Sequence, residues 1–271
     1  MHPVLLKLGP VEIHAYGLML AISFMVGIYW AMARAPKRGI EKNDILDLSI
    51  IVVICAIVGS RFFYVITHLD EFKGRWTDTF NPLQSSGQVG LSGLSMLGGV
   101  VLVLIALVAY CRIKHISILK LCDTLAPTFA LGIGLTRIGC FLNGCCFGRP
   151  GDLPWCVKFP LNSPAGSVLQ NTLIHPTQLY ASLYGFVILG IILLADRKKR
   201  PDGYLLALFF MLYGAARFFI DFVRYYEASV QFHFLGAAFT FNQAISFVLF
   251  AIGLVFFIHL QLHKQQDKQN A

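Results

Sequence analysis

Seven long apolar runs constrain the fold of this chain more than any other feature of its sequence. They cover residues 16–33, 45–66, 91–110, 119–142, 178–195, 203–223 and 239–260. Each run is close to the roughly 20 residues that a helix needs to cross the hydrocarbon core of a bilayer. A spanning segment must satisfy its backbone polar groups internally, so runs of this length fold as helices. The pattern predicts an all-α, polytopic membrane protein with seven transmembrane helices and a small outer loop or head region.

The polar segments between the runs complete the expected organisation. A seven-span membrane domain is expected over residues 1–262, with outer loops at 67–90 and 143–177. The second of these loops contains five prolines and is expected to form a lid or a small head. The residues from 263 to 271 are polar and are expected to be a disordered cytoplasmic tail.

The composition excludes an ordinary soluble domain and leaves a basic excess to explain. Apolar residues make up 56% of the chain and charged residues only 13%, where soluble proteins average about 25% charged. The mean hydropathy is +0.67. The formal net charge is +8, which in a soluble protein would suggest a nucleic-acid partner. The positions of the basic residues indicate membrane topology instead, so no nucleic acid is expected as a partner.

Basic residues concentrate in alternate connections, as the positive-inside rule describes. With the spans above, and with Lys120 counted in the loop 111–120, six of the 22 lie on the side of the N-terminus and three inside apolar runs. The other thirteen lie on the opposite side: Arg34, Lys37, Arg38, Lys42, Arg112, Lys114, Lys120, Arg197, Lys198, Lys199, Arg200, Lys264 and Lys268. The rule therefore predicts a multi-pass protein whose N-terminus is outside and whose C-terminus is cytoplasmic.

Three arginines inside apolar runs are the strongest functional signal. Arg61, Arg137 and Arg217 each lie five or six residues before the outer end of their predicted span. An arginine at mid-span costs roughly 2.5–3.5 kcal/mol on insertion scales, so such residues are functional candidates. Their common depth predicts a shared anion site. The alternative is that each pairs internally, as Arg217 could with Asp221 one helical turn later.

Other polar and small residues extend this interpretation. Tyr213, Arg217, Asp221 and Arg224 have the spacing of one polar stripe on the sixth helix. Gly98 and Gly99 belong to a small-residue face that favours close helix packing, with a groove for a lipid chain as the alternative.

Four cysteines cluster toward the outer side: Cys140, Cys145, Cys146 and Cys156. They form no C-x-x-C motif and have no matching histidines, which favours free thiols or a structural disulfide over redox or zinc chemistry.

Five segments in order resemble motifs of the bacterial prolipoprotein diacylglyceryl transferases. Residues 134–148, GLTRIGCFLNGCCFG, resemble the family signature G-R-x-G-N-F-x-N-x-E-x-x-G. Residues 14–19 (HAYGLM), 59–64 (GSRFFY), 175–180 (HPTQLY) and 213–217 (YGAAR) resemble four further motifs of the same family. One motif alone would be weak, but five in order on a seven-span chain are specific.

The resemblance implies an activity, partners and site residues. It implies transfer of the diacylglyceryl group of phosphatidylglycerol to the lipobox cysteine thiol of exported prolipoproteins, with release of glycerol phosphate, in the bacterial inner membrane. Membrane lipids are expected as surroundings, and no metal or other cofactor. Arg137, Arg217, Tyr16 and Asn143 are the expected catalytic residues. The expected substrate-binding residues are Arg137 again and Arg61, Tyr64, Tyr213, Gly98, Gly99, Gly139, Gly148, His175 and Gln178.

Departures from the family pattern leave an alternative open. The Asn and Glu of the signature are Cys140 and Cys145 here, and a position that often carries His in the family is Leu97. Leucine cannot move a proton. Either the base is another group (His14, His175, Tyr16 or water), or arginine electrostatics suffice, or the chain is a lipid-binding paralogue with absent or altered transferase activity.

Overall fold

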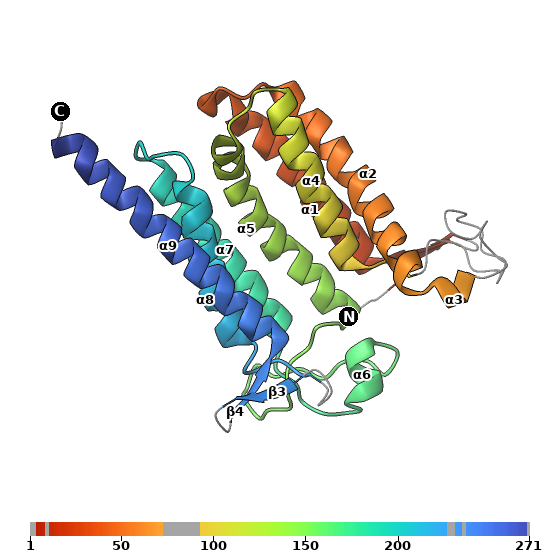
Figure 1. Ribbon diagram of the computed structural model, residues 1–271. Coiled ribbons are helices and arrows are strands. Elements are labelled where there is room, and N and C mark those ends of the chain that lie inside the picture. Colours follow the sequence, from red (N-terminus) through yellow and green to blue (C-terminus); the bar gives the residue numbers. More distant parts are fainter. Residues whose placement is uncertain (1–3, 9–10, 73–92, 227–230, 235–236, 270–271) are drawn as a thin grey trace. The chain divides into compact units, whose positions relative to one another are not determined.

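The computed structural model describes residues 4–8, 11–72, 93–226, 231–234 and 237–269, and helices dominate it (Figure 1). In chain order the elements are β1 (Val4–Leu8), β2 (Val11–His14), α1 (Ala15–Arg34), the 3₁₀ helix η1 (Ala35–Arg38), α2 (Lys42–Thr67), α3 (Leu69–Phe72), α4 (Met96–Ile113), α5 (Ile118–Asn143), α6 (Pro164–Val168), α7 (Thr177–Asp196), α8 (Tyr204–Ile220), β3 (Gln231–Phe234), β4 (Ala237–Thr240) and α9 (Phe241–Gln269).

The seven apolar runs correspond to seven helices, which confirms the predicted fold class. α1, α2, α4, α5, α7 and α9 are long and apolar enough to cross a membrane, whereas α8 is apolar but has 17 residues. Large apolar side chains face outward on these helices; Leu104 and Ile105 of α4, for example, are 56% and 59% exposed. Exposure of this kind suits a lipid environment, where apolar surface has no cost. The chain is a multi-pass membrane protein.

The helix boundaries differ from the expectation at two places. The sixth run was expected to continue to residue 223, but α8 ends at Ile220 and a turn follows. Arg224 therefore lies beyond the helix, where it forms an isolated bridge with Gly148, and the predicted stripe on one helix is wrong at this residue. The tail from residue 263 was expected to be disordered, but α9 continues to Gln269. Gln and Lys are good helix formers, and extending an existing helix needs no new nucleus.

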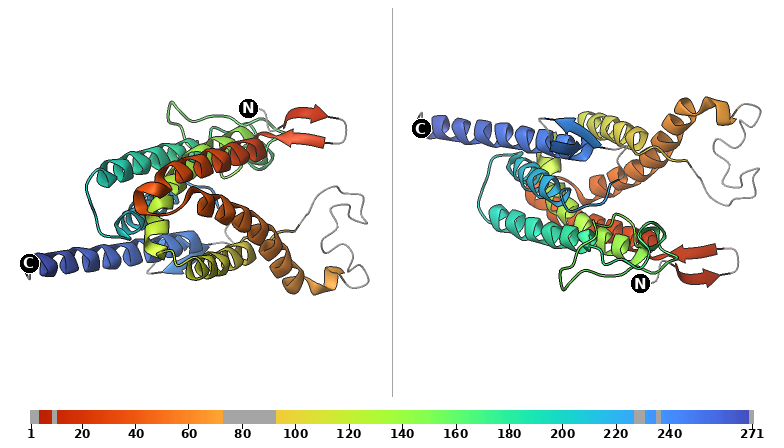
Figure 2. Two further views of the ribbon diagram at one scale, coloured as in Figure 1. Left: turned by 90° about the horizontal axis from the view of Figure 1, so that it is seen from above. Right: turned by 90° about the horizontal axis from the view of Figure 1, so that it is seen from below.

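Two short antiparallel ribbons and a compact segment accompany the helices. β1 pairs with β2 ahead of α1, and β3 pairs with β4 ahead of α9; Figure 2 shows the first ribbon clearly. Hydropathy predicts neither ribbon. Most of the outer loop expected at 67–90 lies outside the described residues. The loop expected at 143–177 contains α6 and bridges from Ile174 to Pro150 and Val157.

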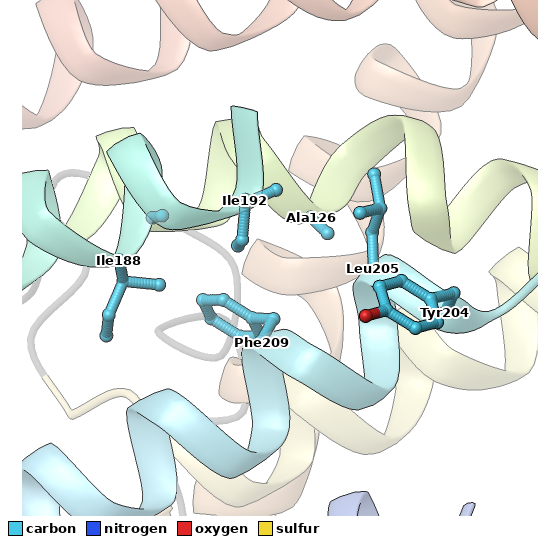
Figure 3. Close-up of a cluster of buried hydrophobic side chains, with 7 residues drawn as sticks. Ala126, Ile188, Ile192, Tyr204, Leu205 and Phe209 are labelled. Atoms are coloured by element: carbon cyan, nitrogen blue, oxygen red, sulfur yellow. The ribbon is translucent and has the colours of Figure 1, made fainter. Parts of the chain in front are cut away.

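The structure divides into two compact units, residues 1–31 with 122–271 and residues 32–121. In the first unit α8 packs against both α7 and α9. Buried side chains of α5, α7 and α8 form its core: Ala126, Ala130, Ile188, Ile192, Tyr204, Leu205 and Phe209 (Figure 3). Glycines allow close approach, since a Cβ on Gly185 would lie 2.7 Å from the backbone nitrogen of Gly134. These contacts fix the ends of the three helices relative to each other.

In the second unit α2 packs on α4 through the small-residue face. A Cβ on Gly59 would lie 2.6 Å from the carbonyl oxygen of Gly98, and a Cβ on Gly98 would collide with Phe63 and Gly59. Gly98 and Gly99 are both buried. Close helix packing, the first of the two interpretations of these glycines, accounts for their position.

A buried carboxylate caps α8 from another helix. Asp123 of α5 is fully buried, and its two oxygens accept hydrogen bonds from the backbone N–H groups of Gly203 and Leu206, both at 2.9 Å. These donors belong to the first turn of α8, which has no partners within the helix. The negative charge also suits the positive end of the helix dipole. Asp123 therefore fixes where α8 begins.

Replacing Asp123 by alanine is expected to lower the free energy of unfolding by about 1–3 kcal/mol, because buried donors lose their acceptor. The change is measurable as a lower midpoint of thermal unfolding in detergent. Asp123→Asn keeps an acceptor oxygen and is expected to lose less. Equal midpoints for the alanine variant and the unmodified protein would contradict this capping role.

Candidate active site

A small pocket in the first unit is lined by residues of three helices and two loops. Its lining residues are Arg137, Cys146, Thr177, Ala181, Tyr184, Arg217, Ile220 and Arg224. The C-terminal ends of α5 and α8 and the N-terminal end of α7 meet here, beside the segment that contains α6 (Figure 1). The pocket thus brings together residues that are up to 87 positions apart, from Arg137 to Arg224.

Arg217 is held by a buried network at the end of α8. Its guanidinium forms an ion pair with Asp221 and donates a hydrogen bond to the Tyr226 hydroxyl at 3.0 Å. Asp221 is 1% exposed, and it also accepts hydrogen bonds from Tyr226 at 3.0 Å and Thr240 at 2.8 Å. The internal pairing expected as the alternative for Arg217 is present. It orients this guanidinium without removing it from the pocket lining.

The other two arginines of the pocket have no acidic partner among the residues that the structure describes. Arg137 lies near the thiol of Cys146 and the hydroxyl of Tyr184, and the guanidinium of Arg224 lies 5.4 Å from the centre of the Tyr226 ring. Three guanidinium groups therefore line a pocket whose lining includes no carboxylate. Such a pocket favours an anion, and arginine suits phosphate because its planar fork can donate two hydrogen bonds at once.

Tyr184 supplies a neutral donor to the same pocket. Its hydroxyl oxygen is buried and has no hydrogen-bond partner among the described residues. Its ring packs edge-on against Tyr213, with 6.3 Å between ring centroids, and Tyr213 in turn stacks on Phe209 at 5.6 Å. Buried hydroxyls are normally paired. The unpaired hydroxyl of Tyr184 is therefore available to a bound ligand.

The sulfur atoms of Cys140, Cys145 and Cys146 lie within 4.8 Å of one another. All seven cysteines of the chain are free thiols in the structure. Asn143 lies within hydrogen-bonding reach of the Cys145 thiol. Hydrogen bonds from Cys140 and Cys145, together with the positive charges of Arg224 and Arg137, hold the pKa of Cys146 below its usual value.

Three of the predicted substrate-binding residues hold the loop after α5 in place. The backbone N–H of Gly148 donates to the His175 carbonyl at 3.1 Å, and the Nδ1 atom of His175 lies 3.2 Å from the Tyr180 hydroxyl. Gln178 is 1% exposed and donates to the Cys145 carbonyl at 2.8 Å. None of the three lines the pocket. Their contacts position Cys145, Cys146 and the adjoining turn.

Tyr16 and Gly139 lie where α1 contacts α5. A Cβ on Gly139 would lie 2.8 Å from the Cβ of Met19 and 3.4 Å from the Cα of Tyr16. Tyr16 is 37% exposed, in the first turn of α1. It carries electrostatic interactions with Arg137 and with the three clustered cysteines. Its position is compatible with the predicted catalytic role, which stays a prediction.

Arg61, Tyr64, Gly98 and Gly99 belong to the second unit. Arg61 is 1% exposed; it donates to the Gly93 carbonyl at 3.2 Å, and its guanidinium lies 5.0 Å from the centre of the Phe72 ring. Tyr64 lies against the same guanidinium at 6.0 Å and stacks on His68. Within its unit, Arg61 joins the end of α2 to the start of α4. Its predicted share in an anion site with Arg137 and Arg217 stays a prediction.

The pocket also contains residues that the sequence analysis did not assign to the site. Thr177, Ala181 and Tyr184 line it from α7, and Cys146 lines it from the loop. The α7 residues are spaced by four and three positions, which puts them on one helix face. This spacing is the only sequence signal that could have predicted them as site residues. It does not distinguish them from other residues of the run, because an alanine and a tyrosine are ordinary in a transmembrane helix.

Comparisons with known proteins identify relatives over nearly the whole chain. Residues 3–259 match the model of a family described as prolipoprotein diacylglyceryl transferase. The chain is 34% identical over 261 residues to the phosphatidylglycerol–prolipoprotein diacylglyceryl transferase of Bordetella avium, covering 94% of this chain and 93% of the relative. The enzyme of the same name from Photobacterium profundum is 34% identical, over 98% of this chain and 95% of its own length. The enzyme of that name from Clostridium tetani is 33% identical, over 83% of this chain and 86% of its own length.

Proposed function

Because the chain belongs to the prolipoprotein diacylglyceryl transferase family, it is a transferase that passes a diacylglyceryl group to prolipoproteins, and we propose that the arginine pocket binds the phosphate of the phosphatidylglycerol donor. The observation that carries this proposal is the pocket lining itself, which contains Arg137, Arg217 and Arg224 and no carboxylate. Phosphatidylglycerol carries one negative charge on its phosphodiester. The lipid-binding paralogue without transferase activity is not favoured by the relatives.

The same arginines suit the chemical step. The acceptor is the lipobox cysteine, whose sulfur attacks the glycerol carbon bonded to the phosphate oxygen. A carbon–sulfur bond forms as the carbon–oxygen bond breaks, the electron pair leaves with the phosphate of glycerol phosphate, and the thiol proton is released to water. Preplaced guanidinium groups stabilise the charge that develops on this oxygen, most strongly in a site that excludes water. Tyr184 donates a hydrogen bond to the same phosphate, and Asn143 and Tyr16 act beside it as catalytic residues.

Charge distribution supports an orientation in the bacterial inner membrane. With the N-terminus outside and the C-terminus in the cytoplasm, the connections rich in Lys and Arg face the cytoplasm. The pocket then opens toward the outer leaflet, where exported prolipoproteins present their lipobox. The surrounding membrane lipids supply the donor to the pocket directly. Cysteine-accessibility labelling of residues in the 196–202 connection and the 144–176 segment in intact cells tests this orientation, since only the latter is expected to react.

A purified-protein assay tests the proposed function. The protein in detergent is supplied with a lipobox peptide and either phosphatidylglycerol or phosphatidylethanolamine, and the thioether product is measured by mass spectrometry. Product is expected only with phosphatidylglycerol. In a second assay, the gene is expected to rescue a strain depleted of its own diacylglyceryl transferase. Normal expression without product and without rescue would instead support the non-catalytic paralogue.

Tyr184→Phe is expected to lower kcat/KM about 10- to 100-fold, because a hydrogen bond to a charged group contributes about 1.5–3 kcal/mol. The variant retains the ring and its packing against Tyr213. The matched control is Tyr180→Phe, whose hydroxyl is hydrogen-bonded to Trp155 and His175. A loss of the same size in both variants would show that Tyr184 has no specific role in the pocket.

A further inference from the structure

The three clustered thiols are held in place by the local structure. α5 ends at Asn143, and Gly144 follows with a φ of +75°, where a Cβ would lie 2.7 Å from Ser163. The backbone N–H of Cys145 then donates to the Cys140 carbonyl at 3.1 Å, which folds the chain back on the helix end. This turn brings together three sulfurs whose C-x₄-C-C spacing matches no usual metal motif.

Contacts from α6 and α7 fix this turn from outside. The carbonyl oxygens of Gly144, Cys145 and Cys146 accept hydrogen bonds from Ala165 N–H at 3.0 Å, the Gln178 side chain at 2.8 Å and the Thr177 hydroxyl at 2.9 Å. Cys146 has a φ of +59°, which is strained for a residue with a side chain. Strain of this kind persists where surrounding contacts impose it, and it concentrates at functional sites.

We propose that Cys140, Cys145 and Cys146 form a three-thiolate site for a zinc-class cation beside the arginine pocket, with the fourth coordination position left to a ligand from outside the protein. Zinc–sulfur bonds are about 2.3 Å long, so three sulfurs around a tetrahedral ion lie about 3.8 Å apart. The sulfurs here lie within 4.8 Å of one another, so a shift of less than about 1 Å completes the site. Cys146 is shared between the cluster and the pocket lining.

The charges around the cluster favour this occupant. Three thiolates and one divalent cation leave a net charge of −1, and Arg137 and Arg224 both interact electrostatically with Cys146. Thiolate sulfurs are soft ligands, so a soft, thiolate-binding ion is preferred over a hard ion such as Mg²⁺, which takes oxygen ligands. Three protein ligands with an open fourth position is the arrangement of catalytic zinc sites, whereas structural sites are closed by a fourth protein ligand.

The open position has a use in the transfer reaction, and this part of the inference rests on the proposed function. A free thiol has a pKa of about 8.5 and is a poor nucleophile at neutral pH. A thiol that coordinates a metal is deprotonated outright. The lipobox sulfur would bind the cation, release its proton to water and then attack the glycerol carbon as the phosphate leaves. No electron is exchanged with the metal. This route supplies the thiolate without a side-chain base.

Metal binding is tested on the purified full-length protein, reduced and stripped of metal by a chelator. Titration with Co²⁺ is expected to give, at one equivalent, the charge-transfer and ligand-field bands of a tetrahedral cobalt thiolate, and Zn²⁺ is expected to displace them. Cys140→Ser, Cys145→Ser and Cys146→Ser are each expected to lose these bands. Cys156→Ser is the matched control, because Cys156 is a buried free thiol that does not belong to the cluster.

Bands that persist in Cys145→Ser, or no stoichiometric binding by the unmodified protein, would overturn the metal site. Variants are first compared by thermal unfolding so that loss of the fold is not mistaken for loss of a ligand. An independent measurement uses the unmodified protein alone. One equivalent of Zn²⁺ is expected to protect Cys145 and Cys146 from alkylation, read by mass spectrometry, and alkylation at an unchanged rate would count against the site.

Activation of the acceptor thiol is tested by the pH profile of transfer. Without metal, a thiol with a pKa of about 8.5 is less than about 1% ionised at pH 6, so removing the metal is expected to slow transfer about 100-fold there and only a few-fold at pH 9. The charged groups that line the pocket are Arg137 of α5, Arg217 of α8 and Arg224, and Tyr184 of α7 lines the same pocket.

The two proposals fail in distinguishable ways. Equal transfer with and without metal at pH 6 would overturn thiol activation, while phosphatidylglycerol binding in the arginine pocket would stand. Absent transfer from phosphatidylglycerol under all conditions would instead contradict the proposed function. The cobalt and alkylation experiments use no lipid substrate, so they report on the metal site in either case.

Discussion

Replacing Arg137 by alanine is expected to reduce diacylglyceryl transfer by about 100- to 1,000-fold, the loss typical of removing one preorganised donor from a developing oxyanion. Arg137 is near both Cys146 and Tyr184 and has no acidic partner within the described part of the chain. Its guanidinium therefore lines the pocket without a carboxylate to compete with a bound phosphate. The effect should appear mainly in kcat, because the phosphate gains charge only as the carbon–oxygen bond breaks.

The controls for Arg137 separate charge from geometry. Arg137→Lys keeps a positive charge but loses the planar fork, and an intermediate rate is expected. Lys158→Ala removes an exposed cation that hydrogen-bonds Asn171 and does not line the pocket, and transfer is expected to be unchanged. Full activity of a well-folded Arg137→Ala protein, measured with phosphatidylglycerol and a lipobox peptide, would exclude the proposed phosphate role.

Replacing Asp221 by alanine is expected to lower the free energy of unfolding by about 3–5 kcal/mol, the cost of leaving one partner of a buried ion pair uncompensated. Asp221 accepts hydrogen bonds from Arg217, Tyr226 and Thr240. All three donors lose their acceptor together, and the end of α8 loses its connection to the start of α9. Thermal unfolding in detergent, followed by circular dichroism, measures the change.

A double variant tells stability apart from activity in this network. Arg217→Met with Asp221→Leu removes both charges, and apolar replacements of a buried pair are often neutral for stability. The double variant is expected to recover most of the lost stability but no transfer, because Arg217 also lines the pocket. A double variant as unstable as Asp221→Ala would show that the hydrogen bonds to Tyr226 and Thr240, rather than the unpaired charge, dominate the loss.

The helices could be predicted because hydropathy and length act locally. Every apolar run became a helix, since a single segment in a bilayer satisfies its backbone hydrogen bonds internally only as a helix. The exceptions arise where local signals compete with tertiary contacts. The run of α8 continues past Ile220 in hydropathy, yet the helix ends there because Asp221 takes part in the network with Tyr226 and Thr240. The ribbon of β3 and β4, which contains Thr240, has no hydropathy pattern that would have predicted it.

The site was only partly predictable for a related reason. Arg137 and Arg217 were conspicuous because a charge inside an apolar run is costly. Tyr184 and Thr177 carry no such cost, and Arg224 was assigned to a helix that ends before it. The loop after α5 is held by contacts with Gln178 and Thr177, more than 30 residues later in the chain. Sequence spacing alone does not reveal such pairs.

The sequence by itself determined the membrane class, the helices, the family and two of the pocket's arginines, because hydrophobic burial, charge cost and motif order are all properties of the linear chain. Only the tertiary structure decided which residues share the pocket and that three cysteine sulfurs converge beside it. That convergence depends on a left-handed turn at Gly144 and on hydrogen bonds from α6 and α7. Distances between side chains from separate elements follow from packing, and packing is a property of the folded whole.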